Sequence, residues 1–229
     1  MTGIGTLIER ASRPDAIMRL EAGDSPADVI RSLGLSPADL IAAIARVGLG
    51  PEGSEGPPLV QSPSPHRQLV RAITEPALAA LWPTAPRPTR LALVAGLLQV
   101  LDAWDASHHA AQEADDLGER ATAAYWHGIA HRREPDPGNA LYWARRVGQH
   151  PTFGAINQAA RPLLEAFGDK PLADRLAPGA GWSPAAMIDL CGRAKVGTPL
   201  ATLARRLQRL EMTALLDATF AALGPAQGE

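Results

Sequence analysis

The chain has a single cysteine, Cys191, which excludes an internal disulfide and any zinc site built on several cysteines. Its formal net charge of −2 at pH 7 argues against an overall basic surface of the kind that binds polyanions. Long apolar runs are also missing, because the most apolar one, LALVAGLLQVLDAW, is too short to cross a membrane. The N-terminus has no basic stretch followed by a long apolar one, so no secretory signal is indicated. We therefore expect a cytoplasmic protein with no membrane contact.

Signals for β-strands are scarce as well, because runs of β-branched residues are few and no alternating segment is bounded by tight-turn dipeptides. Windows rich in Ala, Leu and Arg, separated by Pro and Gly, indicate helices instead. We predict an all-α protein with a multi-helix C-terminal domain and a small N-terminal helix-turn-helix-like module. The helices expected after the module are 67–82, 88–114, 118–133, 138–149, 152–167, 183–195 and 198–223.

The N-terminal module contains two helix starts of one type, the Ser-Pro dipeptides at 25–26 and 36–37. In each dipeptide the serine can cap the helix and the proline suits the first helical position. Asp28 and Asp39 then fall in the first turns, where the helix dipole favours negative charge. Gly34 stands between the two helices, where glycine takes a positive φ at little cost. The pattern is typical of a helix-turn-helix.

A helix-turn-helix suggests DNA binding, but the charge of this module argues against it. The first 49 residues have five arginines against six acidic residues, a net charge of −1. The second helix has no Asn, Gln, Lys or Arg before Arg46, so the donors that neutralise phosphates and read base edges are missing. We expect no nucleic-acid binding and interpret the module as a helical interaction or packing unit.

Composition also predicts how the chain is divided. The segment GPEGSEGPPLVQSPSPH is rich in Gly, Pro and Ser and has little to bury, which is the composition of a linker. We therefore predict a small helical module at 1–49, a linker at 50–66 and a main all-α domain at 67–229.

The expected helix 88–114 changes from an apolar to a polar face along its length. Apolar residues recur at helical spacing up to Leu101, and the same face continues with Asp105, His108 and Gln112. One interpretation is that the helix leaves the core and these groups are solvated. The other is that the face stays buried and its polar groups converge on a ligand, since burying a carboxylate or imidazole is costly unless it is paired.

Two further histidines, His127 and His131, are four residues apart and share one helical face. A short connection favours antiparallel packing, which would place them against His108 or its neighbour His109. Several imidazoles with a nearby carboxylate form the ligand set of zinc or non-haem iron sites. We therefore propose His108, His127 and His131 as metal ligands, with His127 and His131 also as catalytic candidates. The alternatives are a polar core of paired histidines and an organic ligand.

The segment HRREPDPGNALYW contains a pair of cations beside a proline-rich corner. Arg132 and Arg133 end a helix and could present a fork for a carboxylate or phosphate, whereas the alternative is a rigid corner with core aromatics. We expect an anionic small-molecule ligand. The residues proposed to bind it are Asp105, Gln112, Arg132, Arg133, Glu134, Asn139, Tyr142, Trp143 and Arg146.

The C-terminal part contains fewer candidate functional residues. Cys191 has no general base nearby in sequence, so we interpret it as a small buried thiol. Glu211 lies on an amphipathic closing helix, and we expect it to face water.

The segments LDAWDASHHAAQ, YWHGIAHRREPDPGNALYWARRVGQHPTF, WSPAAMIDLC and LQRLEMTALLD resemble, in that order, an uncharacterised family of helical proteins from fungi and bacteria. That family has the signature WHxIxHRREPDxxNAxYWxRRVGxHP, and the resemblance covers residues from about 90 to 220. The chain departs from the family in the compressed, Ala-rich stretch DLGERATAA, where the family has a more polar loop. The resemblance carries no activity, but it implies that the following residues occupy motif positions: His108, Gln112, His127, His131, Arg132, Arg133, Glu134, Asp136, Asn139, Tyr142, Trp143, Arg145, Arg146 and His150.

Three functions fit these patterns. The first is an enzyme in which a histidine serves as metal ligand or general base and an arginine anchors an anionic substrate. The second is a non-catalytic protein that senses a small ligand and contacts a protein partner, or a second copy of itself, through the N-terminal module. The third is a structural helical protein whose motif only builds a polar core.

Overall fold

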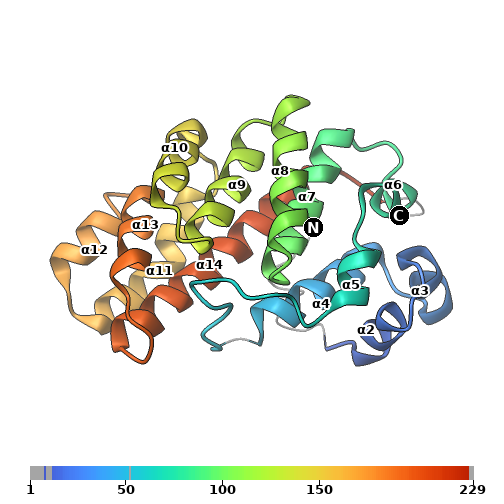
Figure 1. The fold of residues 1–229 in the computed structure, drawn as a ribbon, viewed down its shortest axis with the longest axis horizontal. Helices are drawn as coiled ribbons and strands as arrows, with labels where there is room; N and C mark the ends of the chain where they lie inside the picture. The colour runs from blue at the N-terminus through green and yellow to red at the C-terminus, as the bar shows by residue number, and fades with distance from the viewer. Residues whose placement is uncertain (1–7, 9–11, 52, 227–229) are drawn as a thin grey trace.

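The computed structural model describes residue 8, residues 12–51 and residues 53–226. These residues form thirteen helices and no strand, so the predicted all-α fold is confirmed (Figure 1). The helices are α2 (Pro14–Glu21), α3 (Pro26–Leu33), α4 (Pro37–Leu49), α5 (Arg67–Ala72), α6 (Glu75–Leu81), α7 (Arg87–Val100), α8 (Trp104–Asp116), α9 (Ala121–Arg133), α10 (Pro137–Val147), α11 (Phe153–Phe167), α12 (Lys170–Leu176), α13 (Pro184–Arg193) and α14 (Pro199–Ala221).

The two helix starts predicted near the N-terminus are confirmed. The Ser25 hydroxyl accepts the backbone N–H of Asp28 at 3.2 Å, and Ser36 accepts that of Asp39 at 3.1 Å. Gly34 ends α3 with φ of 61°, a conformation that glycine adopts without steric cost. The likeness of this part to a helix-turn-helix stays a prediction.

Two helices that we expected to be continuous are each divided in two. The predicted helix 67–82 stops at Ala72 and resumes as α6, whose N-cap is Thr74. The predicted helix 88–114 breaks after Val100, because Asp102 takes a φ of 60° and turns the chain back. Helix α8 therefore lies alongside α7 and does not extend it (Figure 1). Helix α12, which no sequence pattern had indicated, follows α11.

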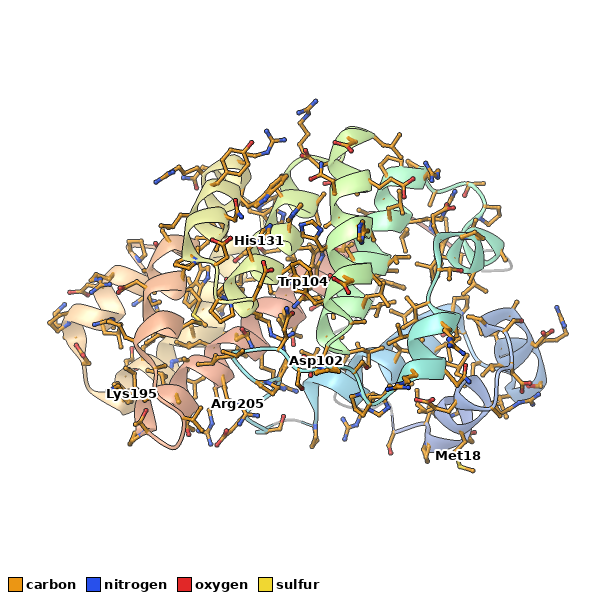
Figure 2. All side chains as sticks on the ribbon, in the orientation of Figure 1. Met18, Asp102, Trp104, His131, Lys195 and Arg205 are labelled. Atoms are coloured by element: carbon orange, nitrogen blue, oxygen red, sulfur yellow. The ribbon has the colours of Figure 1, made fainter. Side chains whose placement is uncertain are left out.

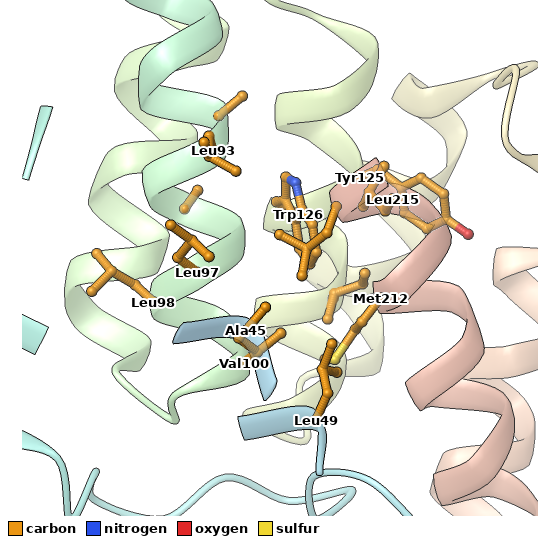
Figure 3. Packing of buried hydrophobic residues seen from close by; sticks show 14 of the residues in the cluster. Ala45, Leu49, Leu93, Leu97, Leu98, Val100, Tyr125, Trp126, Met212 and Leu215 are labelled. Atoms are coloured by element: carbon orange, nitrogen blue, oxygen red, sulfur yellow. The ribbon is translucent and has the colours of Figure 1, made fainter. Parts of the chain in front are cut away.

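Helix α7 lies at the centre of the buried core. Residues 91–98 of this helix are apolar on all sides, and a helix segment of that kind is stable only when neighbours surround it. Figure 3 shows Leu93 and Leu97 of α7 facing Trp126 of α9, with Met212 of α14 nearby. Gly96 lets Trp126 approach closely, because a Cβ there would lie 2.7 Å from the indole ring.

The segment predicted to be a linker contains no helix in its described residues, and several polar side chains hold it against the helices. The guanidinium of Arg209 donates to Gly50 O at 3.3 Å, and that of Arg133 donates to Pro58 O at 3.1 Å. Farther along, the Gln61 N–H donates to Arg133 O. One cluster of buried apolar residues includes side chains from before and after this segment. The division of the chain into two domains stays a prediction.

Among the described helices, none alone combines the length and the apolarity needed to cross a membrane. Helices α3 and α4 meet that requirement only when taken together, across a bend of 115°.

Candidate metal centre

Helices α8 and α9 bring together the three histidines that we proposed as metal ligands. The ring of His108 lies 4.3 Å from that of His127 and 5.1 Å from that of His131, measured between centroids. The rings of His127 and His131 are 5.0 Å apart. One nitrogen from each ring lies within 4.8 Å of the other two, so the cluster could hold a metal ion.

The backbone explains this convergence. His127 and His131 are one turn apart on α9 and point the same way. The turn at Asp102 returns α8 alongside α7 and against α9, and His108 reaches the other two rings from there. The predicted convergence thus occurs between α8 and α9, although the long straight helix on which we based it is wrong.

Two tryptophans enclose the cluster. The indole of Trp104 stacks on His108 with centroids 4.9 Å apart, and Trp143 stacks on His127 at 3.8 Å. Trp104 is itself fixed, because its ring N–H donates to Ala130 O at 3.1 Å. His127 is 1 % exposed and His131 is 8 % exposed, so these walls keep water away from two of the three rings.

Sequence reasoning did not identify Trp104. It precedes His108 by four residues, so helical spacing alone places the two on one face and could have indicated the contact.

Two of the three imidazoles, those of His108 and His127, are held in the neutral form. Burial lowers the pKa of His127 to about 3, and the positive charges of His108, His131 and Arg146 add to the effect. Burial also lowers the pKa of His108, with a smaller opposing effect from the carboxylates of Glu134 and Asp105. A metal ion binds neutral imidazole, so these two rings are ready to bind without losing a proton at neutral pH. Moreover, the Nδ1 of His127 is buried and has no hydrogen-bond partner.

Glu134 orients the third imidazole. His131 Nδ1 donates to Glu134 Oε2 at 2.9 Å, which leaves the other ring nitrogen, Nε2, for an ion. Metal-bound histidines commonly donate to a carboxylate in this way, which fixes the tautomer and makes the ring a better ligand. Asp136 lies close to the same pair and already caps α10, accepting from Asn139 N at 3.0 Å. Asn139, proposed to bind a ligand, thus contributes to a helix cap.

The spacing suits a small ion after minor adjustment. A tetrahedral zinc ion bound at about 2.0–2.1 Å keeps its ligand nitrogens about 3.4 Å apart. The three nitrogens lie within 4.8 Å of one another, so each pair would have to approach by at most about 1.4 Å to bind a zinc ion.

The two arginines proposed to anchor an anion lie in the interior. Arg132 is 2.6 Å from the Glu211 carboxylate, which raises the pKa of the guanidinium against the opposing effect of burial. Arg133 is 0 % exposed, forms an ion pair with Asp102 and donates to Gln99 O at 2.9 Å. The expectation that these two arginines present an accessible fork for an anion is wrong, because both guanidinium groups are buried and already form ion pairs with carboxylates.

The same interior network overturns our expectation for Glu211. Its carboxylate is 0 % exposed and accepts from the Tyr125 hydroxyl at 2.9 Å and the Trp182 ring N–H at 3.1 Å. The expectation that it faces water is wrong, because α14 packs through the middle of the molecule. Burial raises the pKa of the nearby Cys191 thiol to about 11, so the thiol is not a nucleophile at neutral pH.

The remaining proposed residues are spread around the cluster. Gln112 donates to Asp116 at 2.9 Å, one turn farther along α8. Arg146 forms an ion pair with Asp115 at 2.7 Å, and its guanidinium lies 5.2 Å from the centre of the Trp143 ring. Tyr142 is 51 % exposed.

Comparison with protein-family models, curated proteins and solved structures gives no match to this chain.

Proposed function

We propose that the protein binds a divalent transition-metal ion, zinc in the first place, through His108, His127 and His131, and acts as a metal-dependent enzyme. The observation that supports this most is a buried, unpartnered imidazole nitrogen in a cluster of three converging rings. A structural zinc site uses four protein ligands, whereas catalytic sites use three and leave one position for water or substrate. The count of three favours catalysis.

The protein's own residues would supply the surroundings that such chemistry needs. A bound zinc ion supplies Lewis acidity and lowers the pKa of a bound water. Trp104 and Trp143 exclude bulk water from the rings, which strengthens electrostatic interactions at the site. Glu134, with its side chain 38 % exposed, holds His131 in one tautomer.

The test is titration of chelator-treated protein with zinc by calorimetry, alongside cobalt, whose visible spectrum reports its coordination. We expect one ion per chain and the spectrum of a tetrahedral cobalt site. His127→Ala should lower the zinc affinity by on the order of a hundredfold or more, because loss of second-shell partners alone costs 10–100-fold.

His109→Ala is the matched control, because His109 is adjacent to His108 but lies outside the cluster of three, and its Nδ1 bonds to Asp105 O. It should leave the zinc affinity unchanged. Absence of zinc binding by the folded protein, or equal losses in both variants, would show that the cluster is a polar core and not a metal site.

A further inference from the structure

A pocket of about 470 Å³ opens beside Trp104, between the start of α8 and the segment before α5. Figure 2 shows Trp104 between the labelled positions of His131 and Asp102. The indole that stacks on His108 also lines this pocket. The Trp104 indole would therefore separate a molecule bound in this pocket from the histidine cluster.

The charged groups that line the pocket are all carboxylates, and its other polar side chains are neutral. The lining residues are Gln61, Ser62, Pro63, Ser64, Asp102, Ala103, Trp104, Asp105 and Ala106. None of these described residues carries a positive charge. The Asp102 carboxylate forms an ion pair with the buried Arg133, which neutralises its charge. The Asp105 carboxylate is exposed, and the structure gives it no hydrogen bond or ion pair.

An aromatic face beside a carboxylate recognises a cation. An ammonium group within about 6 Å of an indole ring is attracted by its π-electrons, and its N–H groups can donate to carboxylate and hydroxyl oxygens. An anion would meet Asp105 without a compensating cation, since Arg132 and Arg133 are enclosed in ion pairs. The charge preference of this pocket is therefore opposite to the one expected from the sequence.

We infer that the pocket beside Trp104 binds a protonated primary amine carried by an apolar or aromatic group, and that the substrate of the proposed enzyme belongs to this class. The second part rests on the proposed function; the binding of the amine does not need the metal. Asp105 would hold the ammonium group, and Trp104 would contact the rest of the molecule.

The experiment compares phenethylamine with 3-phenylpropionate, a pair of similar size and opposite charge, by calorimetry on the full chain with and without zinc. We expect phenethylamine to bind and to weaken as salt is added, and 3-phenylpropionate not to bind. Asp105→Asn should weaken the amine about fivefold, in the range of a partly exposed ion pair. Asp116→Asn, at the far end of the same helix, should leave amine binding unchanged.

The outcomes separate the two proposals. Amine binding without zinc binding would overturn the proposed metal site, and with it the assignment of the substrate class, but not the binding of amines by the pocket. Zinc binding without amine binding would overturn this inference only. Equal or tighter binding of 3-phenylpropionate, or the same affinity in Asp105→Asn as in the unchanged protein, would also overturn it.

Discussion

At the scale of single residues, the candidate site includes two imidazoles, those of His108 and His127, that burial keeps uncharged. His127 stacks on Trp143, its pKa is about 3, and its Nδ1 has no partner in the protein. Leaving a buried polar atom unpaired costs free energy, so such an atom in a folded protein calls for an explanation. The proposed metal ion would provide one, because it would satisfy a ring nitrogen without requiring a proton.

This neutrality predicts how the stability of the metal-free protein depends on pH. An ordinary histidine has a pKa of about 6.5, so between that pH and about 3 the unfolded chain binds a proton at His127 that the folded chain does not. The free energy of unfolding should therefore fall as pH is lowered through this window. Urea titrations at several pH values should show a shallower fall for His127→Phe, which cannot be protonated, and an equal slope would contradict the assigned environment.

Glu134 provides a second prediction at this scale. Glu134→Gln keeps the size of the side chain but removes the charge that would make His131 a stronger ligand in the proposed site. The affinity for zinc should fall about 10–100-fold, as measured by competition with a coloured chelator. Glu113→Gln, on α8 and paired with Arg87, serves as the control and should bind zinc normally. A Glu134 variant with unchanged affinity would show that the carboxylate plays no part in the site.

At the scale of helices, the turn between α7 and α8 decides whether the site exists. Sequence periodicity indicated the helices themselves, because apolar residues at helical spacing and Ser-Pro starts are local signals. The turn at Asp102 was not predictable in this way. Its positive φ accompanies an ion pair with Arg133, 31 residues away, and such a contact leaves no local pattern. The burial of Arg132 against Glu211 escaped prediction for the same reason.

Removing the Asp102 carboxylate should therefore destabilise the whole protein. Arg133 is 0 % exposed, and a buried ion pair that loses one partner typically costs about 3–5 kcal/mol. We expect that loss for Asp102→Ala in urea unfolding, and a somewhat smaller one for Asp102→Asn, which tolerates the left-handed conformation better. Asp116→Ala, on the exposed end of α8, should change stability by about 0.5 kcal/mol or less. A similar small change for Asp102→Ala would contradict the assigned role.

At the scale of the whole molecule, the N-terminal helices share the core that supports the site. Gly48 of α4 packs against the end of α7 so closely that a Cβ there would lie 1.9 Å from Val100 O. Composition marked residues 50–66 as a linker because they are rich in Pro and Gly. Composition could not show that Arg133 and Arg209 bond to the backbone in and beside this segment.

The close contact at Gly48 predicts that the N-terminal helices and the main domain unfold together. Gly48→Ala should lower the free energy of unfolding by about 3 kcal/mol or more, within a single transition, because the added Cβ would collide with backbone atoms and the two helices would have to move apart. Gly192→Ala is the matched control, because a Cβ at that helical glycine meets nothing within 4 Å, so it should be neutral or stabilising. A separate early transition for the N-terminal helices, with the main transition unchanged, would instead support an independent module.

The central claim is that His108, His127 and His131 form a metal site. The most direct test is a crystal grown with zinc and measured on both sides of the zinc absorption edge. The account predicts one anomalous peak, about 2.0–2.1 Å from one ring nitrogen of each of the three histidines. A folded protein with no peak between these rings, or with zinc held only by other residues, would contradict it.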